Sequence, residues 1–387
     1  MAVGIALLGS TGSIGKSALA VVERHPERFR LVVLAAHRNG GELLVQSARH
    51  RPALAVLADP EMRLQAAPPP GVELRIGREA LLDAARHPGA DVVINAVVGA
   101  AGLEASLAAL GAGKRLALAN KESLVAGGPL VLQALRRGKG ELVPIDSEHS
   151  AILQCLASRR RAVPDAGEVR RLILTASGGP FRERDRGALL DVTPAEALRH
   201  PTWDMGAKVT VDSATLANKA LEVIEAHFLF GVPYDRLEVV IHPQSVVHSL
   251  VEFVDGSVLA QLGFPTMELP ILYALSYPDR IPDGRARFDP VAASPLTFEP
   301  LDAQRFPAFR LGLQAARAGG TAPAAFNAAN EVAVAGFLAE NLPFPRIAEV
   351  IEGALAAHRP APADSLEAVL EADRCARAVA RQMVERT

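Results

Sequence analysis

Lysine, cysteine and aromatic side chains are scarce in this chain, and long apolar runs are missing. Of its 387 residues, two are cysteines and 4% are aromatic. Cys155 and Cys375 lie far apart with no Cys-x-x-Cys spacing, so neither a disulfide framework nor a structural zinc site is expected. The apolar runs are too short to span a bilayer. The chain also starts with a strand-like segment at Val3–Leu8 rather than a signal peptide. We therefore expect a soluble cytoplasmic protein.

Neither sign of charge is in large excess. The formal net charge is −2, which argues against nucleic acid or an anionic membrane as the main partner. Only six of the 41 basic residues are lysines: Lys16, Lys114, Lys121, Lys139, Lys208 and Lys219. Codon bias toward arginine explains why lysine is scarce on the surface. Each remaining lysine is nevertheless a candidate for a site that needs a compact ammonium group.

The first 145 residues alternate short aliphatic runs with helical stretches. We predict strands over residues 3–8, 31–36, 53–57, 91–97, 116–119 and 141–145, and helices over 13–24, 41–50, 81–86, 103–112 and 129–137. Such alternation is typical of a doubly wound parallel sheet. We therefore expect an α/β protein whose residues 1–145 form a Rossmann-like domain.

The pattern changes after residue 145. A helix from 150, a strand over 170–175 and further strands over 237–241, 246–253 and 257–261 indicate an α+β catalytic and connective domain over 146–275. Residues 276–307 are rich in Pro, Asp and Arg and predict a linker. The Ala-rich stretch over 308–387 predicts a C-terminal helical bundle.

A glycine-rich loop directly follows the first predicted strand. It consists of Gly9, Ser10, Thr11, Gly12, Ser13, Ile14 and Gly15. Glycines let the backbone approach a pyrophosphate, and the following helix supplies free N–H donors, which favours a dinucleotide. The second strand is followed by His37, Arg38 and Asn39, with no acid for ribose hydroxyls. An arginine suits the 2′-phosphate of NADP; the alternative is that Arg38 is a solvated loop residue.

Asn120, Lys121 and Glu122 follow another predicted strand of the same sheet. The carboxyl ends of such strands face the ligand crevice. Lys121 could therefore contact substrate oxygens or the nicotinamide region, and Asn120 and Glu122 the cofactor ribose. The alternative is that Asn120 caps a helix and that the two charges are solvated.

Asp146 and Glu148 lie where the predicted sheet ends. Residues two apart in an extended chain point to the same side, so the two carboxylates can converge on a cation. Glu222 would add a third oxygen donor, a set that suits Mg²⁺ or Mn²⁺. The alternative is an ordinary helix start that Asp146 or Ser147 caps.

Residues 177–206 form a Gly/Pro-rich polar segment with glycines at both margins. Such margins would let the segment move as a flap that excludes water. Trp203, the only tryptophan, is a candidate apolar plug for the flap, and Ser177 a candidate phosphate ligand. The alternative is that Trp203 is simply packed.

Residues 212–222 predict one helix that carries Ser213, Asn218, Lys219 and Glu222. Asn218 and Lys219 precede Glu222 by four and three residues, so the three side chains share a face. This stripe could hold a phosphorylated substrate and a cation; an ordinary Lys–Glu surface pair is the alternative. His248, on a later strand, is a candidate phosphate contact or a structural histidine.

Nine segments together closely resemble one family, the 1-deoxy-D-xylulose 5-phosphate (DXP) reductoisomerases. They are GSTGSIG at 9–15, LANKESLV at 118–125, PIDSEHSAI at 144–152, LTASGGPF at 174–181, HPTWDMG at 200–206, VDSATLANKALEVIEAHFLF at 211–230, HPQSVVHS at 242–249, GSVLAQLGFP at 256–265 and FNAANEVAVAGFL at 326–338. The resemblance covers nearly the whole chain. It implies the NADPH-dependent second enzyme of the non-mevalonate isoprenoid pathway, acting as a homodimer on a phosphosugar.

The resemblance also implies roles for individual residues. Asp146, Glu148 and Glu222 would bind the divalent cation (Mg²⁺, Mn²⁺ or Co²⁺). Ser177, Ser213, Asn218 and Lys219 would bind the phosphate, and Lys121 and Ser147 the substrate backbone. His149, His200 and His248 match histidines implicated in activity, Trp203 and Met205 lie on the flap, and Gly206 and Met267 match positions near the cofactor.

Two positions depart from the family pattern. Asp204 stands in the flap where Ser is commoner, and we expect it to point outward. His37-Arg38-Asn39 differs from the usual Gly-Lys/Arg-Asn, which weakens the expected adenosine contacts. Two other functions compete with the implied one: a simple NADP-dependent dehydrogenase of a phosphorylated aldehyde, and a non-catalytic NADP-sensing regulator.

Overall fold

The computed structural model describes residues 2–62, 66–157, 167–184, 186–203, 205–284 and 288–386. It divides into two compact units, called the first unit and the second unit below. The first comprises Met1–Ser123, Val131–Ser150 and Thr266–Arg285, and the second comprises Leu124–Leu130, Ala151–Pro265 and Ala286–Thr387. The segment Thr266–Arg285, which the sequence divided between the middle domain and the linker, thus belongs to the first unit. The three-domain division remains a prediction.

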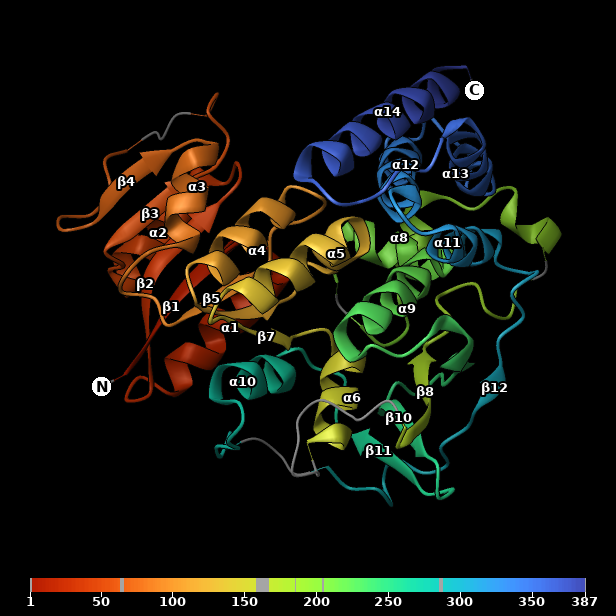
Figure 1. Ribbon diagram of the computed structural model, residues 1–387, viewed down its shortest axis with the longest axis horizontal. Helices are drawn as coiled ribbons and strands as arrows, with labels where there is room; N and C mark the ends of the chain where they lie inside the picture. Colours follow the sequence, from red (N-terminus) through yellow and green to blue (C-terminus); the bar gives the residue numbers. More distant parts are fainter. Residues whose placement is uncertain are drawn as a thin grey trace. The chain divides into compact units, whose positions relative to one another are not determined.

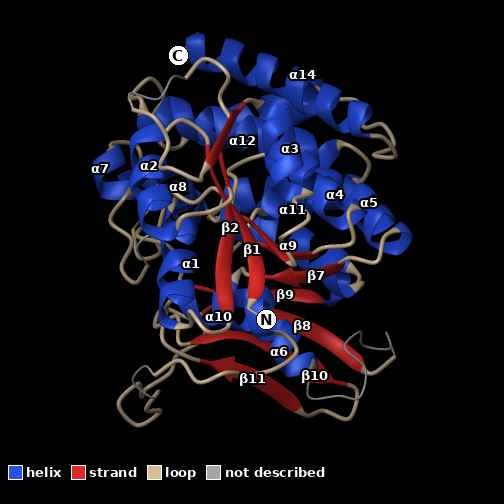
Figure 2. Ribbon diagram, turned by 90° about the vertical axis from the view of Figure 1, so that its left-hand side faces the viewer, coloured by secondary structure: helices blue, strands red, loops and turns tan. Residues whose placement is uncertain are grey.

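The first unit is built on a sheet of seven parallel strands (Figures 1 and 2). They are β1 (Val3–Leu8), β2 (Phe29–Ala36), β3 (Leu54–Leu57), β4 (Glu73–Ile76), β5 (Val92–Asn95), β6 (Arg115–Leu118) and β7 (Glu141–Pro144). The order is β4-β3-β2-β1-β5-β6-β7, with every pair parallel. The strand order reverses between β1 and β5, which confirms the doubly wound sheet and puts its ligand crevice at the end of β1.

The helices of the first unit cover both faces of this sheet, because right-handed crossovers in opposite directions lead to opposite faces. They include α1 (Ser13–Arg24), α2 (Gly40–His50), α3 (Arg78–Ala85), α4 (Gly102–Gly111) and α10 (Glu268–Ser276). Helix α10 comes from far along the chain and packs on α1. Two ion pairs of Arg24 join this region, to Glu268 at 2.5 Å and Asp283 at 3.0 Å. Helices α5 (Lys121–Arg137) and α6 (Ser147–Leu156) contribute residues to both units.

The sequence did not predict strand β4, which is the edge strand beside β3. Its residues Glu73, Leu74, Arg75 and Ile76 are mostly exposed, and two of them are charged. An edge strand buries little surface, so it lacks the continuous apolar run that reveals the central strands.

The second unit contains a mixed sheet of five strands (Figure 2). These are β8 (Val169–Ala176), β9 (Leu237–Ile241), β10 (Val247–Phe253), β11 (Val258–Leu262) and β12 (Glu299–Pro300), in the order β11-β10-β8-β9-β12. Strands β10 and β11 form an antiparallel pair, whereas β8 and β9 run parallel. Strand β12 pairs with β9, so part of the predicted linker belongs to this sheet.

The remaining elements of the second unit are helical. They are η1 (Arg186–Leu189), α7 (Pro194–Ala197), α8 (Ala207–Thr215), α9 (Ala217–Phe230), η2 (Tyr234–Arg236), α11 (Pro307–Ala318), α12 (Ala322–Leu338), α13 (Arg346–Ala357) and α14 (Leu366–Glu385). Helix α12 packs against α11, α13 and α14, and its many buried alanines allow close approach. The predicted C-terminal helical bundle is therefore present.

The prediction of one continuous helix over residues 212–222 is wrong. Leu216 adopts the left-handed conformation, with φ of 57°, and separates α8 from α9. The Thr215 hydroxyl accepts a hydrogen bond from the Ala217 N–H at 3.3 Å, which satisfies a backbone donor at the break. Ser213 therefore lies on a different helix from Asn218, Lys219 and Glu222.

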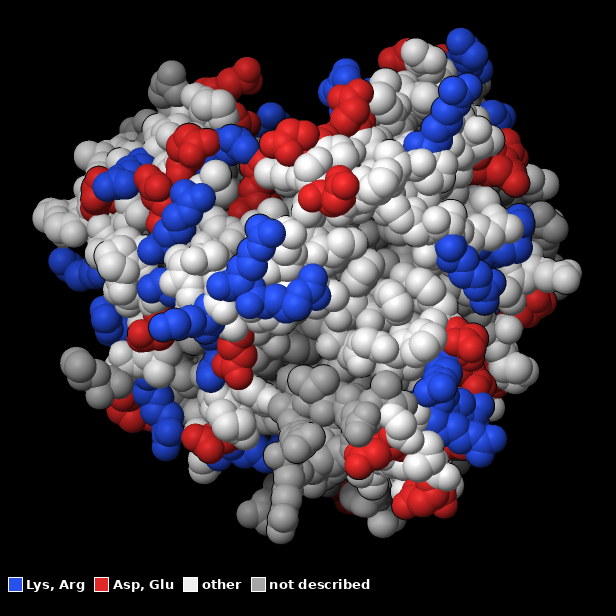
Figure 3. Space-filling view, in the orientation of Figure 1, with Lys and Arg blue, Asp and Glu red and all other residues white. Residues whose placement is uncertain are grey.

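Basic and acidic side chains lie interspersed on the face that Figure 3 shows, in keeping with the small net charge. Within the described ranges, the helices are all too short or too polar to serve as membrane spans.

Candidate active site

The glycine loop of the first unit has a backbone that only glycine can follow at two points. Gly9 has φ of 89°, and a methyl group on it would overlap the carbonyl of Ala96. A methyl group on Gly15 would overlap the carbonyls of Gly9 and Ser10. Gly12 directly precedes α1. The loop thus presents backbone N–H groups at a helix N-terminus, the arrangement that binds phosphate groups in many proteins.

The end of β2 lies beside an acid that the sequence did not suggest. Arg38 Nε is 2.6 Å from Asp59 Oδ2. A hydrogen bond from the Glu61 N–H and the Arg38 guanidinium lower the pKa of the Asp59 carboxyl. Asp59 comes shortly after β3, the neighbouring strand, so a search of every strand end for acids would have found it. Asn39 caps α2 by accepting a hydrogen bond from the Glu42 N–H.

Asn120 both caps a helix and organises the loop that carries Lys121 and Glu122. Its Oδ1 accepts the Ser123 N–H at 3.0 Å, so Asn120 caps the helix as the alternative expected, but Lys121 and Glu122 are buried rather than solvated. Its Nδ2 donates to the carbonyls of Val97 at 2.6 Å and Gly99 at 2.8 Å. Two buried residues that the sequence analysis did not single out, Asn95 and Ser106, also support this loop. Asn95 donates to Ser106 at 2.8 Å, and Ser106 contacts Ser123 at 3.0 Å.

The Asp146 carboxylate is the centre of a charged cluster in the first unit. Lys121 Nζ lies 2.8 Å from one of its oxygens, and His149 Nδ1 lies 3.1 Å from the other. Burial alone would raise the pKa of Asp146, but Lys121 and His149 hold it well below its ordinary value. The Glu148 N–H also donates to this carboxylate, so Asp146 starts α6 as the alternative reading expected, and the Ser147 hydroxyl donates to Glu148.

The face of α9 in the second unit carries three interacting polar side chains. Lys219 forms an ion pair with Glu222, and Asn218 donates a hydrogen bond to the same carboxylate. Lys219 Nζ also donates to the Thr175 carbonyl at 2.5 Å. The Lys219 and Glu222 side chains are only 3% and 1% exposed. This excludes the alternative of an ordinary surface pair and confirms that the three residues share a face.

Ser177 and Ser213 come from segments that pack closely in the second unit. Gly179 has φ of 70°, and a methyl group there would press against the Ser213 carbonyl. The loop after β8 therefore lies directly on α8. Ser177 Oγ in that loop accepts the Gly179 N–H at 3.2 Å and is 2.9 Å from His200 Nε2.

The contacts of His200 determine which ring nitrogen carries its proton. Nδ1 accepts hydrogen bonds from the N–H groups of Thr202 at 3.1 Å and Trp203 at 2.9 Å. Burial lowers the pKa of His200 to about 4, so the ring is neutral near pH 7. The proton is therefore assigned to Nε2, which donates to Ser177 Oγ.

His248 and Trp203 lie near each other, with ring centroids 6.1 Å apart. Burial is the main cause that lowers the pKa of His248 to about 4. The Thr175 hydroxyl donates to the backbone carbonyl of His248 at 2.8 Å. Met205 and Gly206 lead into α8, where Thr210 Oγ1 is 3.0 Å from the Gly206 carbonyl. Asp204 lies outside the described residues, so its predicted outward direction stays a prediction.

Met267 and His37, two residues predicted to lie near the cofactor, both belong to the first unit. Met267 directly precedes α10, and His37 is exposed at the end of β2, where its carbonyl accepts the Asp59 N–H.

Three family models match this chain in order. Residues 5–128 match "1-deoxy-D-xylulose 5-phosphate reductoisomerase", residues 142–230 match its "C-terminal domain", and residues 262–379 match "DXP reductoisomerase C-terminal domain". Together they cover most of the 387 residues. The chain belongs to the DXP reductoisomerase family. It is therefore an enzyme, and the resemblance inferred from its motifs is confirmed.

Similar full-length proteins agree with this assignment. The DXP reductoisomerase of Symbiobacterium thermophilum is 52% identical over 386 residues, with 98% of each chain covered. That of Paraburkholderia phytofirmans is 50% identical over 387 residues, covering 99% of this chain and 96% of the relative.

Solved structures of DXP reductoisomerases have the same fold. The enzyme of Zymomonas mobilis in complex with NADPH has a TM-score of 0.89 and 42% identity, with both chains fully covered. A DOX-P reductoisomerase in complex with NADPH, fosmidomycin and magnesium has a TM-score of 0.89 and 37% identity, covering 99% of this chain and 98% of the other.

Proposed function

We propose that this enzyme converts DXP to 2-C-methyl-D-erythritol 4-phosphate, a step of isoprenoid precursor synthesis. The observation that carries this is the full-length match to the DXP reductoisomerase family. The reaction has two parts, a rearrangement of the carbon skeleton and a reduction of the resulting aldehyde. Each part has a corresponding set of side chains in one or both units.

NADPH binding is assigned to the first unit together with Gly206 of the second, and a relative was crystallised with that cofactor. NADPH would supply the hydride that reduces the aldehyde. The loop over residues 9–15 would receive the pyrophosphate through its backbone N–H groups. His37, Arg38 and Asn39 would lie at the adenosine end, where the Arg38 side chain is 67% exposed. Asn120, Glu122, Gly206 and Met267 are proposed at the ribose and nicotinamide.

Asp146 and Glu148 of the first unit and Glu222 of the second are proposed to hold one divalent cation. Carboxylate oxygens suit a hard ion such as Mg²⁺, and magnesium is present in crystal structures of relatives. The ion would stabilise the negative charge that develops on substrate oxygens during the rearrangement. In the structure, Lys121 forms an ion pair with Asp146, and Lys219 forms one with Glu222. These lysines balance the charge of the two proposed metal ligands.

The phosphate of the substrate is proposed to bind in the second unit, to Ser177, Ser213, Asn218 and Lys219. Two hydroxyls, an amide and an ammonium group match the acceptor oxygens and the charge of a phosphate. Since the phosphate is remote from the reacting carbons, this binding energy can be used to position them. Lys121 and Ser147 are proposed to contact the sugar backbone.

Three histidines and the flap complete the proposed site. His200 donates to Ser177 in the structure, so it can orient a phosphate ligand or donate to the substrate. His149 contacts the proposed metal ligand Asp146. His248 lies beside Trp203. Trp203 and Met205 are proposed to exclude water when the flap covers the substrate.

A homodimer is proposed to form through the mixed sheet of the second unit. Strand β11 is an edge of that sheet, and an unprotected edge is a template for pairing with another chain. Three apolar residues on or near it are 40–48% exposed: Val258, Leu259 and Phe264. Burial of this edge against a second copy would pair the open strand and cover the exposed apolar side chains.

A cytoplasmic location is proposed as well, since both cysteines are free thiols.

The proposed function is tested by following NADPH absorbance with DXP, with and without EDTA. NADPH should be consumed only when DXP and a divalent cation are both present, and the product should be 2-C-methyl-D-erythritol 4-phosphate by mass and NMR. Turnover that survives EDTA would favour the simple NADP-dependent dehydrogenase of a phosphorylated aldehyde. NADPH binding without any turnover would favour the sensing regulator.

A further inference from the structure

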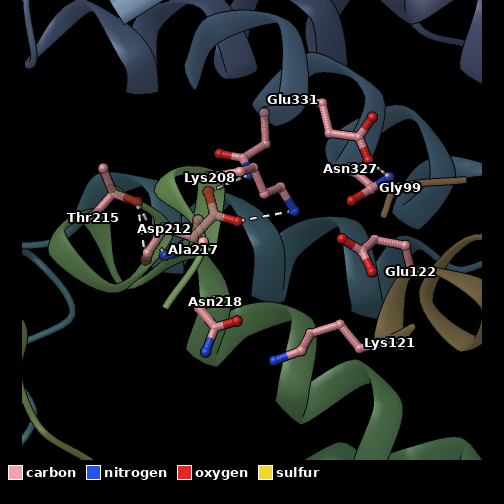
Figure 4. A network of polar contacts seen from close by, with 12 residues as sticks. Gly99, Lys121, Glu122, Lys208, Asp212, Thr215, Ala217, Asn218, Asn327 and Glu331 are labelled. Carbon is pink, nitrogen blue, oxygen red and sulfur yellow. Dashed lines mark hydrogen bonds and ion pairs between the residues drawn. The ribbon is translucent and has the colours of Figure 1, made fainter. Parts of the chain in front are cut away.

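Asp212 is a fully buried carboxylate to which the proposed reaction gives no role. It lies on α8 with 0% of its surface exposed. Lys208, one turn earlier on the same helix, places Nζ 2.9 Å from one carboxylate oxygen. Asn330 of α12 donates a hydrogen bond of 2.8 Å to the other oxygen. Figure 4 shows Lys208 reaching the Asp212 carboxylate.

Burying such a carboxylate is costly for a fold. The loss of hydration of two charges commonly offsets their mutual attraction, so a buried ion pair is weak evidence of stabilisation. An apolar residue would pack α8 on α12 at lower cost. The arrangement is instead specific: Asn330 of α12 fixes the orientation of α8 through a directed hydrogen bond to Asp212, while Lys208 on the same helix balances the carboxylate charge.

Asp212 is also held through its backbone, at the break between α8 and α9. The Thr215 hydroxyl donates to the Asp212 carbonyl at 3.2 Å and accepts the Ala217 N–H at 3.3 Å (Figure 4). Leu216 adopts its left-handed conformation between them. The side chain and the main chain of Asp212 thus anchor the same junction.

The residues proposed to bind phosphate surround this junction. Ser213 is the next residue along α8, and its carbonyl is in contact with the backbone of Gly179 in the Ser177 loop. Asn218 and Lys219 begin α9 directly after the break. A small rotation of α8 would therefore move Ser213 and the Ser177 loop relative to Asn218 and Lys219.

We propose that Asp212 is a positioning residue for the substrate phosphate, acting with Lys208 and Asn330. It sets the angle between α8 and α9, so that the hydroxyl, amide and ammonium donors converge on one anion. This inference rests on the proposed function, because it takes the phosphate of DXP as the anion. It predicts that loosening the junction weakens phosphate binding while leaving NADPH binding in the first unit intact.

The first test is Asp212→Asn. The amide oxygen can still accept from Asn330, but the amide N–H₂ now faces the Lys208 ammonium, so two donors meet. We expect KM for DXP and the inhibition constant of inorganic phosphate each to rise about tenfold, because both constants depend on the phosphate donors. We expect kcat to change less than about threefold and the NADPH dissociation constant to stay the same.

Two further variants separate positioning from a general loss of stability. Lys208→Met in the Asp212→Asn background removes the opposed donors, and phosphate affinity should return toward that of the unchanged enzyme. Glu349→Gln is the matched control, because it breaks an exposed pair with Arg346 on α13 of the same unit. It should change none of these constants. If Asp212→Asn does not fold, Asn330→Ala tests the same junction and should raise the phosphate constant severalfold.

An Asp212→Asn enzyme that is thermally destabilised, but has unchanged constants for phosphate and DXP, would overturn the inference. A loss of kcat with unchanged phosphate affinity would overturn it as well. Failure of the unchanged enzyme to turn over DXP would instead contradict the proposed function. The two failures are distinguishable, because inorganic phosphate binding is measured without turnover.

Discussion

In the first unit, the polar side chains of the candidate site follow the carboxyl ends of parallel strands. In the second unit they surround a break between two helices. Asn120 and Lys121 come shortly after β6, and Asp146 comes shortly after β7. Ser213 lies before the break at Leu216, whereas Asn218 and Lys219 lie after it.

This difference matters for how each site tolerates change. A strand end is fixed by a whole ladder of backbone hydrogen bonds, so its position depends little on any one side chain. The helix break depends on a few directed contacts of Thr215, Asp212 and Asn330. We therefore expect substitutions in the two units to affect different measurements.

The largest effect is expected for Glu222→Gln. This variant tests whether a change in the second unit can abolish turnover without affecting NADPH binding. The amide removes a charged donor from the proposed metal set, so kcat/KM should fall by about a thousandfold. The NADPH dissociation constant, measured by fluorescence titration, should be unchanged because Glu222 is not among the proposed cofactor residues, which apart from Gly206 lie in the first unit. The control is Glu238→Gln on β9, which breaks an exposed contact with Arg171 and should leave activity intact. Loss of NADPH binding in Glu222→Gln would contradict the separation.

A second test compares Gly9→Ala with Gly12→Ala, two changes in one loop of the first unit. Gly9 has a positive φ and no room for a methyl group, so its replacement should cost about 2–4 kcal/mol of stability. At Gly12 the nearest atom to an added methyl is the Gly9 carbonyl oxygen at 3.5 Å, an ordinary contact. Gly12→Ala should fold normally and weaken NADPH binding by about tenfold. Equal melting temperatures for the two variants would show that the strand end does not constrain Gly9.

Arg38→Met tests the adenosine end of the first unit. If Arg38 contacts the 2′-phosphate, the preference for NADPH over NADH should fall by about tenfold, the value of one charge-assisted contact. Arg49→Met is the matched control, because Arg49 is also 67% exposed and also pairs with one acid, Glu23. A similar change of preference in both variants would mean that only surface charge was measured.

The smallest effect concerns His248 and the pH dependence of stability in the second unit. Its pKa in the fold is about 4, below the ordinary 6.5, because the ring is buried. As the pH falls from 6.5 to 4, the unfolded chain binds a proton that the folded chain does not, so stability decreases. His248→Asn should remove about 1 kcal/mol of this decrease at pH 5.5. Urea unfolding at pH 7.5 and 5.5 measures it, with exposed His37→Asn as control. An unchanged pH dependence in His248→Asn would contradict the assigned pKa.

Much of the first unit could be predicted from short windows of sequence. The aliphatic runs at β1, β2 and β5 are buried central strands, and buried parallel strands read as continuous apolar segments. The glycine loop was recognisable because a strand, a turn and a helix follow one another. The edge strand β4 was missed, since it lacks that apolar signal.

The second unit was harder to predict from the same kind of signal. The spacing of Asn218, Lys219 and Glu222 correctly indicated one helical face. The same spacing reasoning wrongly continued that helix back to Ser213. No residue in this stretch is a usual helix breaker, and Leu216 takes a conformation that its own side chain disfavours.

The sequence by itself determined the order of elements, the phosphate-binding character of the glycine loop and the polar face of α9, because each depends on residues a few positions apart. The tertiary structure decided where α8 ends, which acid meets Arg38 and what holds Asp212. Asn330 reaches Asp212 across 118 positions of chain. Only folding brings such partners together, and only burial makes their hydrogen bond obligatory.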